Sequence, residues 1–216
     1  MTHISKLTII KHVPAEPLDM FKSIIERINS TSIIMNIATM DKEFHILNRS
    51  VAYRGLVDNS ICFVTERNTR KYHNIIANPN VALTMFFPEV YNPNTPNIKE
   101  TWQVRLINGK AVELEPTQIA KLWTEEPIFA KIRSHICKCG EPVNHEELLQ
   151  KHDELLKEYE NGCNKLEQTN TYTAFKIIPK IWDFYKNEEN CIADRVQYSL
   201  EITETEQKWK VYHVNA

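Results

Sequence analysis

Short β-rich segments follow one another through the chain and constrain its fold more than any other feature. Turn-forming pairs such as Asp41-Lys42 and Asn108-Gly109 separate them. The predicted strands span about 32–39, 48–53, 60–65, 81–87, 102–107, 110–114, 172–178, 181–186, 196–203 and 208–213. Because helices do not alternate regularly with these strands, a doubly wound parallel sheet is disfavoured. We expect an α+β fold built on an antiparallel barrel with flanking helices.

Helical patterns occur at four places along the chain, one of them a short segment from Arg70 to about Ala77. Residues 1–16 are expected to form an N-terminal arm, which leads into a helix with its first apolar position at Leu18. Another helical region begins near Pro116, and the strongest helical pattern spans 145–160. The apolar stripe of this last helix fits either the protein core or a subunit contact, and amphipathicity alone leaves both open.

The composition is that of one ordinary globular domain. The chain has 216 residues without a sharp shift in composition, so residues 17–216 are expected to form a single domain. Its 26 basic and 28 acidic side chains give a net charge of −2. This weak net charge provides no overall field for nucleic acid or an anionic membrane, and we expect neither as a partner. Anion binding would have to come from local clusters, which occur around Arg49 and Arg70.

Cysteine usage indicates a reduced, cytoplasmic protein. The five cysteines are an odd number, and no apolar stretch of the signal-peptide type lies at the N-terminus. The longest apolar-rich segment, 32–38, is too short and too polar for a membrane span. We therefore expect a cytoplasmic location.

A group of cysteine and histidine residues raises the question of a metal site. Its members are His135, Cys137, Cys139, His145 and Cys163. Their spacing is not that of a standard zinc knuckle or ribbon, so ordinary free thiols are favoured over zinc ligands. We expect no metal, and no side chain stands out as a catalytic residue.

A basic pair follows a threonine between two predicted strands. Thr69 is expected to cap a short helix from Arg70 to about Ala77, with Arg70 and Lys71 in its first turn. The start of a helix presents unpaired N–H groups and a positive dipole end, which two basic side chains would reinforce for a phosphate. Taken alone, these residues favour a solvated basic turn over a phosphate site.

Proline, asparagine and threonine crowd the segment 87–97 and predict a long loop over about 88–100. This length exceeds what a simple hairpin needs. A lid over a site and a surface insertion are both compatible with the sequence.

Four motifs occur in order along the chain. They are Arg49-Ser50-Val51-Ala52-Tyr53-Arg54, then Phe63-Val64-Thr65 with Thr69-Arg70-Lys71, then Trp102-Gln103-Val104-Arg105, and finally Asp183-Phe184-Tyr185 with Asp194-Arg195. In type and spacing this series resembles the pyridoxamine 5'-phosphate oxidase family of FMN-binding split barrels, over roughly residues 30 to 213. Any one of the motifs is a weak signal, whereas four in register are specific.

The resemblance implies an FMN cofactor, a split-barrel fold and a homodimer in which two chains share each flavin. Residues 172–216 resemble the C-terminal dimerisation region of the family. The positions that match flavin contacts are Arg49, Ser50, Val51, Ala52, Tyr53, Arg54, Val64, Thr65, Arg70, Lys71, Gln103, Tyr185 and Arg195. Tyr185 stands where the family has a tryptophan.

The positions that would hold the substrate depart from the family pattern. Arg54 conservatively replaces a substrate-binding lysine, but the positions of a tyrosine, an arginine and a serine that grip the substrate phosphate hold other residues. These are Leu122, Glu126 and Ala130, and the family's arginine and histidine nearer the C-terminus correspond to Cys191 and Ala193. Glu126 reverses the charge of a phosphate-binding arginine and should repel a dianionic ligand.

Two hypotheses of different kinds follow from the resemblance. The first is an FMN-dependent oxidase that converts pyridoxine or pyridoxamine 5'-phosphate to pyridoxal 5'-phosphate, in vitamin B6 metabolism, or a related oxidoreductase with another small substrate. The second is a non-catalytic paralogue that binds FMN or a B6 phosphate without turnover. The replaced substrate positions are the feature that separates them.

Overall fold

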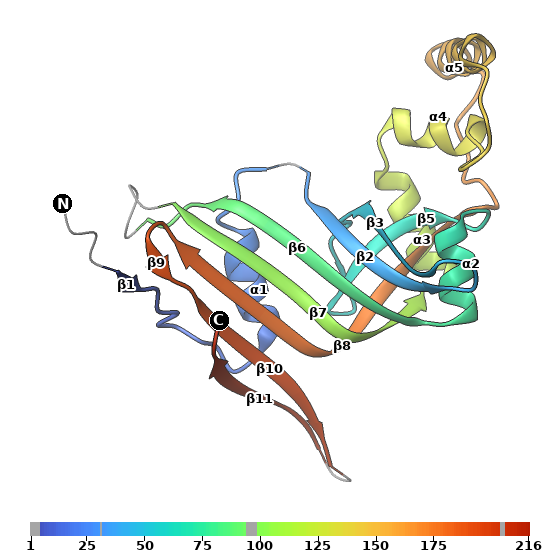
Figure 1. Ribbon diagram of the computed structural model, residues 1–216. Helices are drawn as coiled ribbons and strands as arrows, with labels where there is room; N and C mark the ends of the chain where they lie inside the picture. Colours follow the sequence, from blue (N-terminus) through green and yellow to red (C-terminus); the bar gives the residue numbers. More distant parts are fainter. Residues whose placement is uncertain (1–4, 31, 94–98, 204–205) are drawn as a thin grey trace.

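A computed structural model describes residues 5–30, 32–93, 99–203 and 206–216 (Figure 1). A nine-stranded, antiparallel sheet curls into a barrel and confirms the expected α+β architecture. Its main path has the order β11-β10-β8-β7-β6-β2-β3, and β5 pairs with both β4 and β8. The strands are β2 (Ile34–Asp41), β3 (His45–Ala52), β4 (Leu56–Val57), β5 (Ser60–Glu66), β6 (Asn80–Val90), β7 (Glu100–Glu113), β8 (Tyr172–Glu188), β10 (Asp194–Ile202) and β11 (Gln207–Val214).

Strand β8 connects the barrel to a C-terminal hairpin. Its first part pairs with β5, up to Ile61 opposite Ile177, and its second part pairs with β10 from Ser199 opposite Ile181. Between these two neighbours lies Pro179, inside a strand of 17 residues. A proline lacks the N–H that a ladder needs, so it is tolerated where one edge of the strand has no partner. The prediction of two separate strands, 172–178 and 181–186, is therefore wrong.

The prediction of a turn at Asn108-Gly109 is also wrong, because both residues lie within the single strand β7. The pairing of β6 with β7 shifts between Val81 and Leu83, and Asn108 adopts a φ of 52°, so the pair forms a β-bulge. A Cβ atom on Gly109 would lie 3.0 Å from the Ile177 side chain and 3.1 Å from the backbone oxygen of Val81, and this close approach favours glycine. Asn108 and Gly109 were expected to form a turn that reverses the chain. They instead introduce a bend into one continuous strand.

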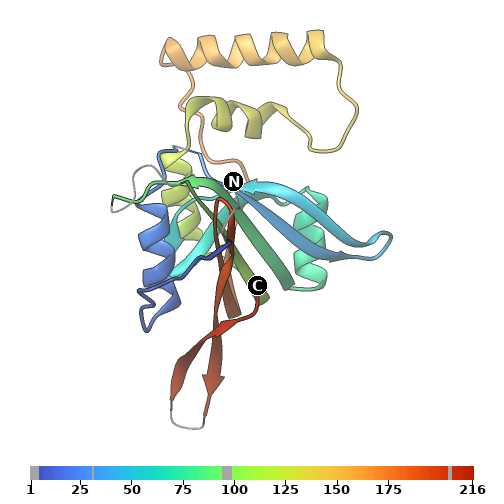
Figure 2. The same ribbon diagram turned by 60° about the vertical axis from the view of Figure 1, so that its left-hand side comes forward.

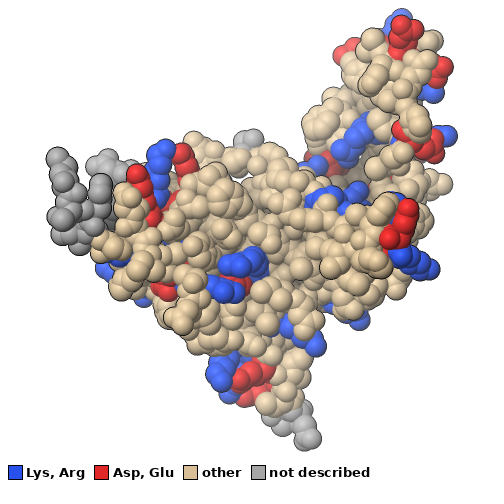
Figure 3. Space-filling view, viewed as in Figure 1, with Lys and Arg blue, Asp and Glu red and all other residues tan. Residues whose placement is uncertain are grey.

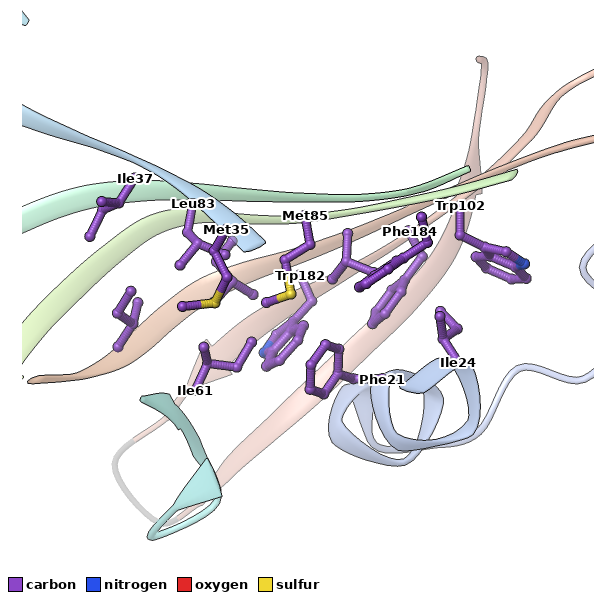
Figure 4. Close-up of a cluster of buried hydrophobic side chains, with 14 of the residues drawn as sticks. Phe21, Ile24, Met35, Ile37, Ile61, Leu83, Met85, Trp102, Trp182 and Phe184 are labelled. Atoms are coloured by element: carbon purple, nitrogen blue, oxygen red, sulfur yellow. The ribbon is translucent and has the colours of Figure 1, made fainter. Parts of the chain in front are cut away.

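The N-terminal helix α1 (Pro17–Ile25) packs its apolar face on the inner side of the barrel. Phe21 and Ile24 point toward sheet side chains that include Trp182 and Phe184 (Figure 4). The rings of Phe21 and Trp182 are 5.6 Å apart, and Trp182 stacks on Phe184 at 5.8 Å. Burial of these aromatic side chains is the main stabilising contribution at this end of the barrel.

Residues of the expected N-terminal arm lie along the C-terminal strands. Strand β1 (Lys6–Leu7) pairs in parallel with β9 (Cys191–Ile192). The backbone N–H of Ile10 donates to Asp194, and the hydroxyl of Tyr198 donates to the carbonyl of Pro14. These contacts connect the start of the described chain to β10.

The remaining helices are α2 (Arg70–Ala77), α3 (Pro116–Glu125), α4 (Ile128–Ile136) and α5 (His145–Glu160). Helix α5 has the predicted bounds, but it projects from the barrel together with α4 (Figure 2). None of the described α5 residues is buried, so the core alternative for its stripe is wrong in the single chain. A subunit contact for this stripe stays a prediction.

The loop predicted over 88–100 is shorter than expected, because β6 continues to Val90 and β7 begins at Glu100. Residues 94–98, the centre of the predicted lid, lie outside the described residues. The lid and the surface insertion therefore both stay predictions.

Candidate functional site

The junction between β5 and α2 has the predicted cap. Thr69 precedes the helix, and its hydroxyl accepts the backbone N–H of Tyr72 at 3.3 Å. The hydroxyl groups of Thr69 and Thr65 lie 3.0 Å apart in a buried position, which fixes the end of β5 to the start of the helix. The first turn of α2 thus begins at a rigid point, with Arg70 and Lys71 on it.

Arg70 already has carboxylate partners within the chain. Its Nε donates to Asp41 at 2.7 Å, its Nη2 donates to Glu43 at 2.6 Å, and its guanidinium lies over the ring of Phe44. This donation by Arg70 holds the pKa of the Asp41 carboxyl well below its usual range, helped by the backbone N–H of Phe44. A phosphate would have to compete with two carboxylates for this side chain, and its role as a flavin contact stays a prediction.

Arg49 and Lys71 differ from Arg70, because neither forms a salt bridge with any residue that the structure describes. Arg49 lies opposite the buried Ile37 and donates to neutral oxygens, among them the Thr39 hydroxyl at 2.6 Å. Burial lowers the pKa of Lys71, and the neighbouring charges of Arg49 and Arg133 lower it further. Burial likewise lowers the pKa of Arg49. Asp41 acts on Arg49 and Glu66 acts on Lys71 in the opposite direction, but neither carboxylate forms an ion pair with them among the described residues. The fold thus brings basic side chains without salt-bridge partners together beside the start of α2.

This cationic cluster, defined as Arg49, Lys71 and Arg133, combines residues of β3, α2 and α4. Lys and Arg side chains gather in the notch between the barrel and the projecting α4 in the space-filling view (Figure 3). Sequence reasoning did not nominate Arg133, because α4 was not predicted and the position of Arg133 beside Lys71 depends on the tertiary fold. Arg49 and Lys71 are half-buried and Arg133 is exposed. Cations without salt-bridge partners favour the binding of a phosphate group.

Gln103, Tyr185 and Arg195 form a second group, which lies in one row across β7, β8 and β10. Gln103 and Tyr185 alternate with the buried Trp102 and Phe184, so they lie on the outer face of the barrel. Arg195 donates through Nε and Nη2 to one carboxylate oxygen of Asp183, at 2.8 and 2.5 Å.

The carboxylate of Asp183 is fully buried and organises the outer face around it. Gln197 also donates to its Oδ2, and Arg105 Nη2 lies 3.3 Å from its Oδ1. The Nε of Arg105 and the Oδ1 of Asp183 have no hydrogen-bond partner among the described residues. This face therefore retains unused polar capacity next to Gln103 and Tyr185.

The two groups of nominated residues are far apart within one chain. Thr65 lies opposite Thr173 near the start of β8, and Tyr185 follows 12 residues later, since 185 − 173 = 12. At about 3.3 Å per residue this part of the strand extends over about 40 Å. Strand β8 runs from the end of the sheet near α2 to the end near β9 (Figure 1). A ligand the size of FMN cannot contact Thr65 and Tyr185 of the same chain.

The nominated substrate residue Arg54 forms a salt bridge with Glu126. Its Nε donates to Oε1 at 2.9 Å and its Nη2 donates to Oε2 at 3.2 Å. The hydroxyl of Tyr172 donates to the same Oε1 at 3.1 Å. Leu122 lies beside this pair, and Ala130 is buried nearby in α4. Two positions expected to contact a substrate, Arg54 and Glu126, thus form one internal ion pair, and Leu122 lines the same pocket.

The other nominated residues lie along β3 and β5. Ser50 is exposed and donates to Asn36, and Val51 is buried in the barrel core. Burial raises the pKa of Tyr53 to about 12, and its ring packs edge-on against Phe21. Ala52 and Val64 are half-buried, with Val64 packed in a second apolar cluster beneath α3. Cys191 and Ala193 lie near β9, beside the N-terminal residues rather than near Arg54.

The cysteines named with a possible zinc site lie at the surface. Cys137, Cys139 and Cys163 are exposed, free thiols. In the described ranges, no group of three or more histidine, cysteine, aspartate or glutamate side chains is arranged to hold a metal ion. None of the helices within these ranges has the length and apolar character needed to cross a bilayer.

Sequence similarity links the chain to named oxidases, although no family model matches it. A pyridoxine/pyridoxamine 5'-phosphate oxidase from Idiomarina loihiensis is 23% identical over 207 residues, which cover 93% of this chain and 90% of that protein. The chloroplastic pyridoxine/pyridoxamine 5'-phosphate oxidase 1 of Arabidopsis thaliana is 23% identical over 181 residues, or 83% of this chain. The chain spans 32% of the length of this plant relative.

Solved structures share the fold over nearly the whole chain. PhzG from Burkholderia lata 383, in complex with tetrahydrophenazine-1-carboxylic acid, superposes with a TM-score of 0.71 at 20% identity, covering 94% of both chains. A pyridoxamine 5'-phosphate oxidase-related, FMN binding protein from Nostoc punctiforme gives a TM-score of 0.68 at 16% identity, covering 94% of this chain and 100% of that one. These likenesses confirm the predicted split barrel.

Proposed function

Because the chain is a pyridoxamine 5'-phosphate oxidase-like protein at modest sequence identity, we propose that it binds FMN and oxidises a small substrate with it. The observation that carries this proposal is the cationic cluster beside α2. Arg49 and Lys71 match flavin-phosphate positions of the family and have no carboxylate partner in the described chain. Helix α2 adds the positive end of its dipole to the same place. The residues present therefore fit the phosphate of FMN.

Bound FMN would supply a two-electron acceptor for a hydride from the substrate. The side chains of this chain would hold the cofactor and exclude water, and none of them has to take part in a covalent step. Within the family pattern the substrate is pyridoxine or pyridoxamine 5'-phosphate and the product is pyridoxal 5'-phosphate. Loss of a hydride and a proton would convert the alcohol of pyridoxine 5'-phosphate directly to the aldehyde. The amine of pyridoxamine 5'-phosphate would give an imine, which water would hydrolyse to the aldehyde and ammonia.

We further propose that two copies of the chain share each flavin. The separation of Thr65 from Tyr185 along β8 supports this, because one chain cannot bring both groups to one cofactor. In a homodimer, Arg49 and Lys71 of one chain would hold the phosphate. Gln103, Tyr185 and Arg195 of the other chain would contact the flavin ring or its edge.

A second candidate is a non-catalytic paralogue that binds FMN or a B6 phosphate. The salt bridge between Arg54 and Glu126 favours it, because the residue nominated for the substrate is already occupied. The two candidates differ in turnover and agree on the cofactor.

The test is a visible absorption spectrum of the purified protein, recorded before and after anaerobic addition of pyridoxamine 5'-phosphate and, separately, pyridoxamine. Flavin bands that bleach with either amine support an oxidase. Flavin bands that persist with both support the paralogue. A protein that neither contains nor takes up FMN contradicts both candidates.

Mixed dimers test whether the flavin sites are shared. Lys71→Gln and Arg195→Gln chains, each deficient in FMN as homodimers, are co-expressed with different tags and the mixed dimer is isolated. Shared sites give one intact site per mixed dimer, so about half of the wild-type flavin content returns. If each site is built from one chain, every site carries a substitution and no flavin content returns.

A further inference from the structure

The salt bridge between Arg54 and Glu126 forms one wall of a small pocket of about 200 Å³. The pocket lies where α3 ends and α4 begins, and Leu122, Glu125 and Pro127 complete its lining. Its charged groups are one guanidinium and two carboxylates. Because Glu126 neutralises Arg54, no uncompensated positive charge remains in the pocket for an anion, and the Glu125 carboxylate is exposed, so solvent and salt screen it.

The fork of Arg54 is directed at Glu126 through two parallel hydrogen bonds. This bidentate geometry is the one that an arginine would use for a phosphate, so the internal carboxylate occupies the place of such a ligand. A phosphate that approached Arg54 would also come close to the Glu126 carboxylate, whose side chain is only 3% exposed. Repulsion between like charges is strong at such a weakly solvated position.

The position of Glu126 is fixed by its neighbours, so it cannot easily turn away. Its backbone N–H donates to the carbonyl of Trp123 at 3.2 Å, and Pro127 follows with its restricted φ. Tyr172 donates to its carboxylate and packs against the ring of Trp123 at 4.8 Å between centroids. Burial, together with the nearby Glu126 carboxylate, raises the pKa of Tyr172, so this phenol stays protonated as a donor at neutral pH.

We infer that this pocket selects against phosphate and that the substrate presents an uncharged or cationic group to it. The chain would then act on a non-phosphorylated small molecule. The inference rests on the proposed function for the reaction, while the charge of the pocket stands on its own contacts.

The experiment compares two probes that differ only in a phosphate, pyridoxine 5'-phosphate and pyridoxine. Their affinities for the FMN-loaded protein are measured by calorimetry for wild type, Glu126→Gln and Glu126→Arg. Glu125→Gln is the matched control, because it removes the same charge from an exposed residue of the same pocket that does not bond to Arg54. Flavin content, measured first by absorbance, reports separately on the proposed cofactor.

Wild type and the control should show no preference for the phosphate probe. Glu126→Gln frees Arg54 and should raise the affinity for pyridoxine 5'-phosphate by about tenfold, with pyridoxine unchanged, and Glu126→Arg should raise it further. If Glu126→Arg does not fold, the affinity of Glu126→Gln for pyridoxine 5'-phosphate alone tests the inference.

A wild-type protein that binds the phosphate probe about tenfold more tightly than pyridoxine would overturn the inference. Folded Glu126 variants that gain no phosphate affinity would overturn it as well. A protein without flavin would contradict the proposed function alone, because the phosphate preference of the pocket is then measured on the flavin-free protein.

Discussion

Two regions of this barrel use arginine in opposite ways. Beside α2, Arg49 and the adjacent Lys71 have no carboxylate partner in the described chain, whereas Arg54 shares two hydrogen bonds with Glu126. Both arginines belong to the same sequence motif and are five positions apart on the chain (54 − 49 = 5). The presence of a basic residue therefore does not define an anion site. The internal charge that the fold brings to that residue decides whether an external anion can bind.

Arg70 shows how local this effect is. It is adjacent to Lys71 in sequence, yet Asp41 and Glu43 form salt bridges with it, whereas Lys71 forms none with the residues that the structure describes. The turn between β2 and β3 supplies both carboxylates, and the sequence indicated this segment only as a turn. We therefore expect Arg70 to anchor this turn on α2, with less influence on FMN than its neighbour.

The largest expected effect concerns FMN affinity. Each charged hydrogen bond to a phosphate contributes about 1.5–3 kcal/mol, so Arg49→Gln with Lys71→Gln should weaken FMN binding by about 10²- to 10⁴-fold. Quenching of FMN fluorescence on titration with apoprotein measures this. Arg67→Gln with Lys110→Gln is the matched control, because Arg67 pairs with Glu113 and Lys110 is exposed on β7. Equal losses in both double variants would show that overall charge, rather than the cationic cluster, holds the cofactor.

The salt-bridged carboxylate of Glu100 should make the stability of the protein depend on pH in the acid range. Burial would raise the pKa of Glu100, but hydrogen bonds from Lys186 and Trp102 outweigh it and lower the pKa from 4.5 to about 2. A carboxyl group with a lowered pKa stabilises the folded state at pH values above the pKa of the unfolded state. This contribution is lost as the pH falls from about 4.5 through about 2. Because Glu100 is only 1% exposed, solvent screens this interaction little, and its contribution to the free energy of unfolding is about 3 kcal/mol.

Urea unfolding of wild type and Glu100→Gln from pH 6 to pH 2 measures this contribution. The difference in unfolding free energy between the two proteins should shrink by about 3 kcal/mol toward pH 2. A difference that does not vary with pH would mean that the carboxylate is not stabilised by its partners.

Removal of the carboxylate from the paired pocket should destabilise the protein. Glu126→Gln leaves Arg54 without its charged partner and should lower the free energy of unfolding by about 1.5 kcal/mol, because Arg54 keeps partial access to water. Glu125→Gln, at an exposed position, should change it by less than about 0.5 kcal/mol. Urea midpoints at pH 7 measure both. Equal midpoints for wild type and Glu126→Gln would show that the salt bridge contributes nothing to the fold.

The smallest expected effect has the opposite sign. Burial and neighbouring cations make Lys71 costly in the apoprotein, so Lys71→Met should leave stability unchanged or raise it by up to about 1 kcal/mol. The same variant should lose FMN affinity. Thermal unfolding of the apoprotein measures the first effect, and a clear loss of stability would show that Lys71 has a structural partner rather than a binding role.

Local signals in the sequence predicted many elements correctly. Thr69 and the basic first turn predicted α2, and the helical stripe predicted the bounds of α5. Capping and amphipathic periodicity involve residues within a few positions of each other, so they can be read from the sequence. Asn108-Gly109 and Pro179 misled the prediction, because turn-forming residues also occur at bulges and at unpaired strand edges.

The sequence by itself determined the barrel strands, the capped helix and the motifs that nominate Arg49 and Lys71. The family resemblance also nominated Glu126 for the position of a phosphate-binding arginine. Only the tertiary structure decided that Arg70 and Arg54 are paired while Lys71 is not, because their partners Asp41 and Glu126 lie 29 and 72 positions away. Electrostatic pairing depends on distances across the fold, and those distances arise only when the strands assemble.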